Sequence, residues 1–561
     1  MNKKVFALIM LFVGACIVAV FLISINNRSV QFCMDDDGFI EISVHVNSYK
    51  EIIKPYYCER DDTYYFFMPS VICDKKIYND IENNEFIINQ KKLNKYGVFE
   101  WGNGEVNKFV FSDKEVKVVF MESSDIATLF ITTDTGDMEN LNADKKNIEH
   151  GKVDIIEPNG TLSYSGGLSL TGRGNSTFKM FDKKPFNIKL DDSAGILGME
   201  SNKDWCLLAN SWDYSYMNNK LAFDMASMAG FAYVPDAEYA DVYFNGEYWG
   251  IYLVTEKVEV DDKRIDITDL KRKNQDVNPQ VDITLAEKFD NGDTRGVILD
   301  NQPNDISGGY LLEKDYRLNA ERYGEDRFVM TTSYFETYDY GTSINIKSPE
   351  YATEDEVNYI RQLTSEMEYA ILASDGYSKE GKYYLDYIDL DSWVKWYMIA
   401  EIAYDLDKDG TNTYFYKDID EKNTHFYMGP VWDYDCRFGG TYQYPSPEIL
   451  TKLNKTGVWC CNLYDKTEFY DEVCRDWNVL FNDYLREDAQ NKINIWQEQI
   501  TQSVKMDNVR WYRGEGYPVE WPVSDNSSEF ISEYSFEEQA DHLRQWVETR
   551  RKFLDKYWGE K

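Results

Sequence analysis

The hydrophobic pattern of this chain changes its period along the sequence. Short alternating runs such as FIEISVHVN (39–47) and VKVVFM (116–121) predict strands that are separated by polar turns. Residues 353–400 and most of 466–505 have helical spacing instead. Because strands come early and helices late, the pattern predicts an α+β protein with large sheets in its first half.

The same pattern divides the chain of 561 residues, which is long enough for several domains. Residues 30–115 hold only alternating runs and predict a small, all-β accessory module. Residues 120–558 then combine strands and helices, and we expect them to form one large α+β domain. Residues 1–28 differ from both and are treated as a membrane anchor or signal segment.

Local signals fix several element ends. Gly230 follows a helical run and is a plausible C-cap, and the pair Asn245-Gly246 predicts a tight hairpin. Ser535 and Glu538 have the spacing of a capping box at the start of a long amphipathic helix. The turn and cap chemistry therefore supports the assignment of strands and helices.

The N-terminal segment has an apolar run from Val5 to Ile23 behind Lys3 and Lys4. At about 1.5 Å per residue this run approaches the thickness of a bilayer core. An uncleaved anchor is favoured over a cleaved signal, and over a lipoprotein cleaved before Cys16. We expect a single-pass protein of the cell membrane with the rest of the chain outside, or a secreted or cell-surface protein.

The amino-acid composition of the chain argues against several classes of ligand. The chain carries 98 acidic and 60 basic residues, a net charge of -38, which disfavours nucleic acid and anionic lipid headgroups as ligands. The presence of only four histidines and the lack of a C-x-x-C spacing argue against a zinc site. Cys58 and Cys73 flank a strand-like run and are the first choice for a disulfide.

The segment AYDLDKDGTNTYFYKD (403–418) allows two interpretations. Alternating aspartates from Asp405 to Asp409, followed by Gly410, resemble the start of a calcium-binding loop. Such a loop needs a bidentate glutamate at its twelfth position, which here is Tyr416, and it should enter a helix. The residues after the loop alternate as a strand does, so the calcium interpretation is disfavoured.

The second interpretation is a kinase catalytic loop. Asp407 and Asn412 have the D-x-x-x-x-N spacing, and Asp433 and Asp435 follow a further strand. In this interpretation Asp407 accepts the proton of the substrate hydroxyl, while Asn412, Asp433 and Asp435 hold a divalent metal through hard oxygen ligands. A W-D-x-D alone would more often cap a turn, but coupled to D-x-x-x-x-N it favours a metal site.

Candidate nucleotide ligands lie upstream. Lys189 stands in the alternating strand PFNIKL, as does the lysine that holds ATP phosphates in protein kinases. Arg173, Gly174 and Asn175 form a tight turn that can direct a guanidinium and backbone N–H groups at phosphate. Each signal is weak alone, because an edge lysine is often a solvated gatekeeper and a glycine turn often just a hairpin.

Taken together, these segments resemble the CotH kinase family, named for spore coat protein H. The resemblance covers roughly residues 120–558 and rests on five motifs in family order. These are GRGNSTFKMFDKKPFNIKL, NGEYWGIYLVTEKV, GGYLLEKD, DLDKDGTNTYFYKD and GPVWDYDCRFGG.

The resemblance implies an atypical protein-kinase-like fold with a β-rich N-lobe and a helical C-lobe. It implies ATP and Mg²⁺ or Mn²⁺ as cofactors, and Ser or Thr of exported spore-coat or cell-surface proteins as substrates. By motif, Asp407 matches the catalytic aspartate and Asp433 the metal-binding aspartate. Lys189 and the Arg173 turn match the nucleotide-binding strand and loop.

Some positions depart from the family pattern. Asp405 and Asp409 are extra acidic residues that can attract a second cation, and Asn218 stands where relatives often have arginine. The glutamate that should pair with the nucleotide lysine is not evident, and Asp224 and Glu256 are the candidates. A catalytically silent surface or coat protein that uses the same fold for binding is therefore the alternative function.

Overall fold

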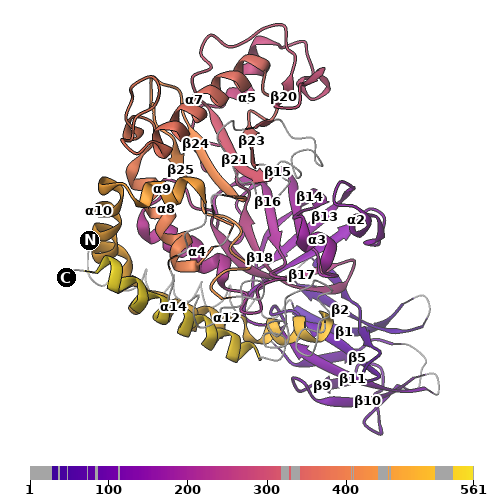
Figure 1. Cartoon of the computed structure of the whole chain (residues 1–561). Helices are drawn as coiled ribbons and strands as arrows, with labels where there is room; N and C mark the ends of the chain where they lie inside the picture. Colours follow the sequence, from indigo (N-terminus) through magenta and orange to yellow (C-terminus); the bar gives the residue numbers. More distant parts are fainter. Residues whose placement is uncertain are drawn as a thin grey trace, which may run out of the picture.

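A computed structural model describes residues 28–559 with gaps at 36–37, 47–48, 73, 82–85, 112–113, 317–326, 330–341, 406, 409, 440–452, 454–456 and 512–534. Three β-rich layers follow one another from the lower right to the top of Figure 1, and helices cover the last two. The mixed α+β class and the all-β N-terminal region agree with the sequence prediction.

The N-terminal region consists of two sheets. A 5-stranded sheet and a 6-stranded sheet enclose a core rich in aromatic side chains, such as Phe32, Phe109 and Phe120. Aromatic residues fit the half-buried, pleated surface of strands, and this core continues into the barrel through Phe130 and Tyr243. The sheets have the orders β3 (Tyr49–Ile53), β2 (Ile40–Val46), β1 (Arg28–Met34), β6 (Lys76–Asn79), β9 (Val98–Glu100), and β4 (Tyr56–Cys58), β5 (Thr63–Met68), β11 (Lys114–Glu122), β10 (Val106–Phe111), β7 (Ile87–Ile88), β8 (Lys91–Lys92).

The middle layer is a closed barrel, in which the parallel pairing of β12 with β17 joins the first strand to a late one. Asn245 (φ 53°) and Gly246 (φ 87°) form the predicted hairpin, since both residues take the left-handed conformation of such turns. The barrel has the order β12 (Ala127–Thr133), β13 (Ile148–Ile156), β14 (Leu162–Gly172), β15 (Phe186–Ala194), β16 (Asn202–Leu208), β18 (Glu247–Glu256), β17 (Ala237–Phe244), with short helices α2 (Glu139–Ala143) and α3 (Ser176–Met180) in its connections.

The third layer is a 7-stranded sheet, so the predicted helical C-lobe is wrong in part. The strands of this sheet come from segments far apart in sequence. Local runs such as TYFYKD (413–418) therefore predicted single strands and did not reveal the sheet. β21 pairs with β23, about 30 residues later in the chain, and with β24, about 100 residues later. The order is β19 (Lys288–Asp290), β20 (Thr294–Val297), β22 (Arg327–Val329), β23 (Thr342–Ser348), β21 (Tyr310–Tyr316), β24 (Thr413–Lys417), β25 (Tyr427–Met428).

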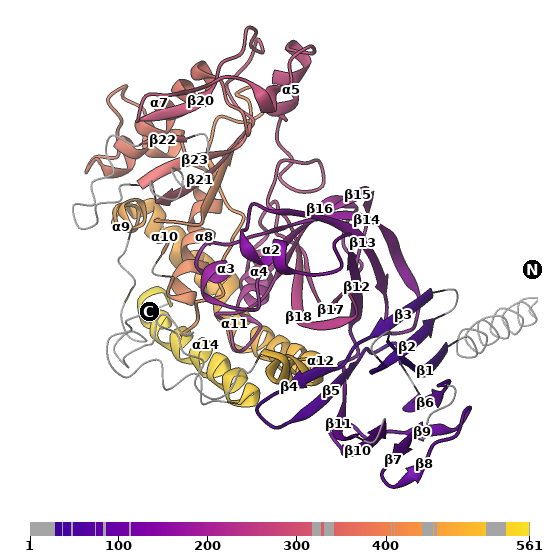
Figure 2. The same ribbon diagram turned by 90° about the vertical axis from the view of Figure 1, so that its right-hand side faces the viewer.

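Helices surround this sheet and one side of the barrel (Figure 2). The capping box at Ser535 and Glu538 is confirmed, and Gly230 is the left-handed C-cap of α4. The helices are α4 (Asn218–Ala229), α5 (Leu270–Val277), η1 (Ile283–Leu285), α7 (Glu354–Leu372), η2 (Tyr384–Asp386), α8 (Leu390–Ala403), α9 (Val458–Tyr464), α10 (Thr467–Asp476), η4 (Trp477–Phe481), α11 (Asn482–Arg486), α12 (Asp488–Trp511) and α14 (Phe536–Trp558).

The long helix α12 contacts the N-terminal region, the barrel and the C-terminal helices. Near its C-terminal end Asp507 forms a buried ion pair with Lys183, whose Nζ lies 2.7 Å from the carboxylate. The Ser503 hydroxyl accepts a hydrogen bond of 3.0 Å from the Ser124 backbone N–H, just after the N-terminal region. α12 also packs beside α14, as Figures 1 and 2 both show. The N-terminal region is thereby fixed against the barrel.

The prediction of a single-pass membrane protein needs correction. Within the described part of the chain, no helix is both long and apolar enough to cross a bilayer. The apolar run on which the prediction rested ends at Ile23 and lies outside that part. The suggested disulfide is not supported either, since Cys58 is a buried free thiol and Cys73 falls in one of the gaps.

Candidate active site

The loop after α8 carries the proposed catalytic aspartate. Tyr404 (φ 53°) ends the helix in the left-handed conformation, and the Asp405 N–H then donates to the Ala400 carbonyl at 2.8 Å. A turn follows in which the Asp407 carbonyl accepts hydrogen bonds from Gly410 (2.9 Å) and Thr411 (3.1 Å). The chain is thus turned sharply between the end of α8 and the start of β24.

A second loop, after β25, carries the W-D-x-D motif. The two loops meet where the Asn412 side-chain amide donates a hydrogen bond of 2.6 Å to Asp433 Oδ2. Both residues have left-handed backbones, with φ of 53° and 67°. Non-glycine residues adopt this conformation at some cost, which points to a functional constraint on the contact. The structure therefore brings D-x-x-x-x-N and W-D-x-D into one site.

A buried arginine joins the same two loops. Arg437 is 3% exposed, and its Nη2 lies 2.9 Å from Asp407 Oδ2 while its Nε lies 2.5 Å from Asp405 Oδ1. The Asp405 Oδ1 atom also accepts a hydrogen bond of 3.0 Å from the Asp407 backbone N–H. Asp405 and Arg437 consequently hold Asp407 from two sides. Asp409, the third aspartate of the loop, lies outside the described residues.

Side chains at the N-terminus of α4 form hydrogen bonds with the backbone of the second loop. The Asn218 side-chain amide donates hydrogen bonds of 3.0 Å to the carbonyls of both Asp435 and Arg437. The Asn219 side chain accepts a hydrogen bond of 2.8 Å from the Tyr434 N–H. Asp213 in turn accepts one of 2.7 Å from the Asn218 N–H. Asn218, where relatives often have arginine, thus positions the backbone of the motif.

The electrostatics of the site suit a divalent cation. Burial, and then the nearby Asp435 carboxylate, raise the pKa of Asp433 to about 7. Burial also raises the pKa of Asp435, partly offset by Arg437. Two neighbouring, partly buried carboxylates repel one another unless a cation joins them, and carboxylate oxygens are the donors that Mg²⁺ and Mn²⁺ prefer. Asp433 and Asp435 are a donor set that fits such an ion, and Asn412, the third predicted ligand, here directs its amide N–H at Asp433.

The glycine turn before α3 reaches the site through its arginine. The Arg173 guanidinium lies 5.1 Å from the centre of the Trp432 ring, and its charge acts to lower the pKa of Asp433. Gly174 has φ of 76°, which this tight turn requires. The Asn175 side chain is bound to a different residue, since its Oδ1 accepts a hydrogen bond of 2.9 Å from Lys145.

Lys189 lies elsewhere. Its side chain is 63% exposed on β15, between two residues of the barrel core, and its closest carboxylate is Asp204 at 3.8 Å. Neither candidate partner touches it: Asp224 binds Lys492 and Tyr484, and Glu256 accepts a hydrogen bond from the Asp236 N–H. Because side chains alternate along a strand, Lys189 points outward, and the structure does not bring it to the aspartates.

A comparison with known protein families matches residues 170–554 to CotH, described as the CotH kinase protein. The chain belongs to the CotH kinase family. A search of curated proteins found no match. The family match covers most of the chain, and Arg173, Asp407, Asn412, Asp433 and Asp435 all lie inside it. Membership makes this a kinase-like protein, for which ATP and a divalent metal are the expected cofactors.

Three further residues of this CotH-family site escaped sequence reasoning. Lys408 is fully buried and binds Glu401 at 2.8 Å, and Glu401 also binds Arg550 of α14 at 2.6 Å. These charges anchor the loop that carries Asp407 to the core of the last layer. The only local signal for these ion pairs is a lysine inside an acidic loop. The pairs themselves could not be predicted, because Glu401 and Arg550 are 7 and 142 residues away from Lys408 in sequence.

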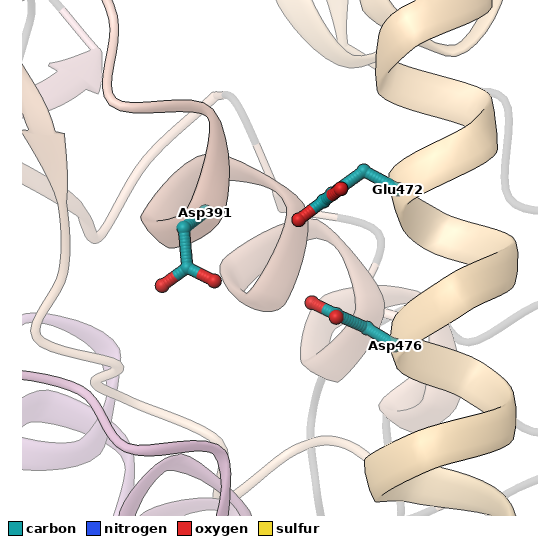
Figure 3. Close-up of side chains that lie close together, drawn as sticks. All are labelled: Asp391, Glu472 and Asp476. Atoms are coloured by element: carbon teal, nitrogen blue, oxygen red, sulfur yellow. The ribbon is translucent and has the colours of Figure 1, made fainter.

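Acidic side chains also gather at a different place in the molecule. Asp391 on α8 and two residues of α10, Glu472 and Asp476, direct carboxylate oxygens within 4.8 Å of one another (Figure 3). Their charges are met by basic neighbours, since Lys395 binds Asp391 at 2.7 Å and Arg475 contacts both glutamate and aspartate of α10. This group is an ion-pair network between two helices, and we assign no metal to it.

Proposed function

We propose that this CotH-family protein is an ATP-dependent kinase that transfers the γ-phosphoryl group to a Ser or Thr hydroxyl of a protein. The hydrogen bond between Asn412 and Asp433 carries the proposal, because it unites the catalytic loop and the metal motif in one site. Family membership supports the same reaction class. A kinase-like arrangement of barrel and C-terminal layer around this site is part of the proposal.

Asp407 is placed to receive the substrate. Its side chain is 37% exposed, whereas the neighbouring Asp405 side chain is 11% exposed. The contact with Arg437 uses Oδ2, which leaves Oδ1 to accept the proton of an incoming hydroxyl. The ion pair orients the carboxylate before the substrate arrives, as efficient general-base catalysis requires.

Asp433 and Asp435 would hold the divalent ion, and Arg173 would contact the phosphates. A bound Mg²⁺ or Mn²⁺ ion neutralises charge on the phosphate oxygens during transfer. The guanidinium of Arg173 can bind phosphate oxygens in a bidentate manner, and the Gly174 turn leaves the backbone accessible. The acidic chain, with a net charge of -38, needs such local cations to accept an anionic nucleotide.

One observation favours a second candidate, a catalytically silent binding protein. Lys189, the expected phosphate-binding lysine, is 63% exposed and has Asp204 as its closest carboxylate, at 3.8 Å. A site that lacks this charge can bind without transferring phosphate. The two functions differ in whether phosphate leaves ATP.

The test is incubation of the purified chain with γ-labelled ATP, a panel of protein substrates and Mg²⁺ or Mn²⁺. We expect label on Ser or Thr with the wild type and none with Asp433→Asn, a variant of nearly the same shape. Asp391→Asn, in the ion-pair network, is the matched control and should behave as the wild type. Nucleotide binding without transfer across the panel would favour the silent protein.

A further inference from the structure

The Arg437 guanidinium stands among four carboxylates. It contacts Asp405 and Asp407 directly, and its charge also acts to lower the pKa values of Asp433 and Asp435. The side chain is almost completely buried. Since a guanidinium is always charged and only donates hydrogen bonds, it is a permanent counter-ion for this acidic site.

The position of the guanidinium is fixed by its backbone. The Arg437 N–H donates a hydrogen bond of 3.0 Å to the Tyr434 carbonyl, and its own carbonyl accepts one from Asn218. The next residue, Phe438, donates a hydrogen bond of 3.0 Å to the Ala403 carbonyl at the end of α8. The loop that carries the arginine is thereby tied to the loop that carries Asp407.

The extra aspartate of the catalytic loop is the partner of this cation. Asp405 is buried, and burial raises its pKa while Arg437 opposes that effect. Its Oδ1 is used twice, by Arg437 and by the Asp407 N–H. A divalent ion on Asp405 Oδ1 would have to displace Arg437, and the buried guanidinium would then keep only its contact with Asp407, which is unfavourable.

We propose that Arg437 takes the place of a second divalent cation in this site, so that one Mg²⁺ or Mn²⁺ ion accompanies the nucleotide. Asp433 and Asp435 hold that ion, and Arg437 is a positioning residue that neutralises Asp405 and orients Asp407. This inference rests on the proposed function, because it concerns the ion that arrives with ATP. In this arrangement the Asp405 carboxylate binds an arginine and no metal.

The test counts Mn²⁺ ions bound to the full chain in the presence of a non-hydrolysable ATP analogue, from the electron paramagnetic resonance signal of unbound Mn²⁺. We expect one ion per chain for the wild type. Arg437→Lys keeps a cation and should also bind one ion. Arg437→Met removes the charge but keeps a side chain of similar length. This variant should bind a second Mn²⁺ ion with lower affinity than the first. Adding Asp405→Asn to the same chain should abolish the binding of that second ion.

The wild-type count decides the proposal even where Arg437→Met lowers the melting temperature. Two ions on the wild type would overturn the inference and leave phosphoryl transfer intact as the proposed function. A folded Arg437→Met chain that still binds a single ion would overturn it too. A wild type that binds no Mn²⁺ with the analogue would instead overturn the proposed function itself, together with the inference that depends on it.

Discussion

Asn412 and Asp433 are 21 residues apart in sequence and share a hydrogen bond of 2.6 Å between two left-handed backbone positions. The contact aligns a loop that would activate the substrate hydroxyl with a loop that would hold the metal. Because both loops would act on one phosphoryl group, their contributions to catalysis are expected to depend on one another.

Asp407→Ala and Asp433→Ala should each lower kcat by on the order of a hundredfold or more, the usual cost of losing a general base or a metal ligand. The double variant should be little worse than either single variant, since both residues act in one transition state. Steady-state kinetics with labelled ATP measures this, with thermal melts to show that all chains are folded. If the kcat losses of the two single variants multiplied in the double variant, the two residues would act in separate steps.

Arg173→Met should raise the KM for ATP roughly tenfold, which corresponds to the loss of about 1.4 kcal/mol of phosphate binding. Lys189→Ala is the matched comparison and should change KM little, because its side chain is exposed and binds Asp204. Equal increases in the two variants would show that the nucleotide reaches the outer face of β15, and would restore the role that the family resemblance implied for Lys189.

The sequence predicted the aspartates of this site because their signal is local. The spacing of Asp407 and Asn412 within one loop, and of Asp433 and Asp435 within another, is a property of short segments. Arg437 stands two residues after Asp435, yet its role was invisible, since it depends on contacts with Asp405 and Asp407 about 30 residues earlier. Long-range charge pairing is what sequence patterns lack.

In the fold, too, local features were predictable from the sequence and long-range pairings were not. Capped helices such as α14 and the Asn245-Gly246 hairpin follow from a few adjacent residues, and both were predicted correctly. The 7-stranded sheet was missed, because β21 pairs with strands that are distant in sequence. The surroundings of Lys189 were also beyond sequence reasoning: its strand exists, and strand alternation directs the side chain outward from the barrel, where Asp204 is its closest carboxylate.

The buried pair of Lys183 and Asp507 should be a strong determinant of stability. Lys183→Met leaves the Asp507 carboxylate in the interior without its cation, which typically costs about 3–5 kcal/mol. The double variant with Asp507→Asn should recover part of this loss, because neither buried charge remains. Urea unfolding measures both. Equal losses in the single and double variants would mean that packing around the lysine stem, and no unpaired charge, is responsible.

The last prediction concerns the pH dependence of stability, which Asp241 should influence. Its carboxylate accepts hydrogen bonds from Ser503 and Tyr248, both at 2.8 Å, and from Ser123, at the junction of the N-terminal region, the barrel and α12. Burial nonetheless raises its pKa from 3.8 to about 6. The folded chain therefore holds the proton more tightly than the unfolded chain does.

A pKa raised on folding favours the folded state at low pH, and this stabilisation is lost as pH rises from about 4 through 6. A shift of about two units corresponds to on the order of 3 kcal/mol. Asp241→Asn keeps an amide oxygen to accept hydrogen bonds but does not titrate. Relative to the variant, the wild type should lose up to that amount of unfolding free energy between pH 4 and pH 7. Urea unfolding at several pH values measures this difference, and parallel curves for the two chains would show that Asp241 titrates alike in both states.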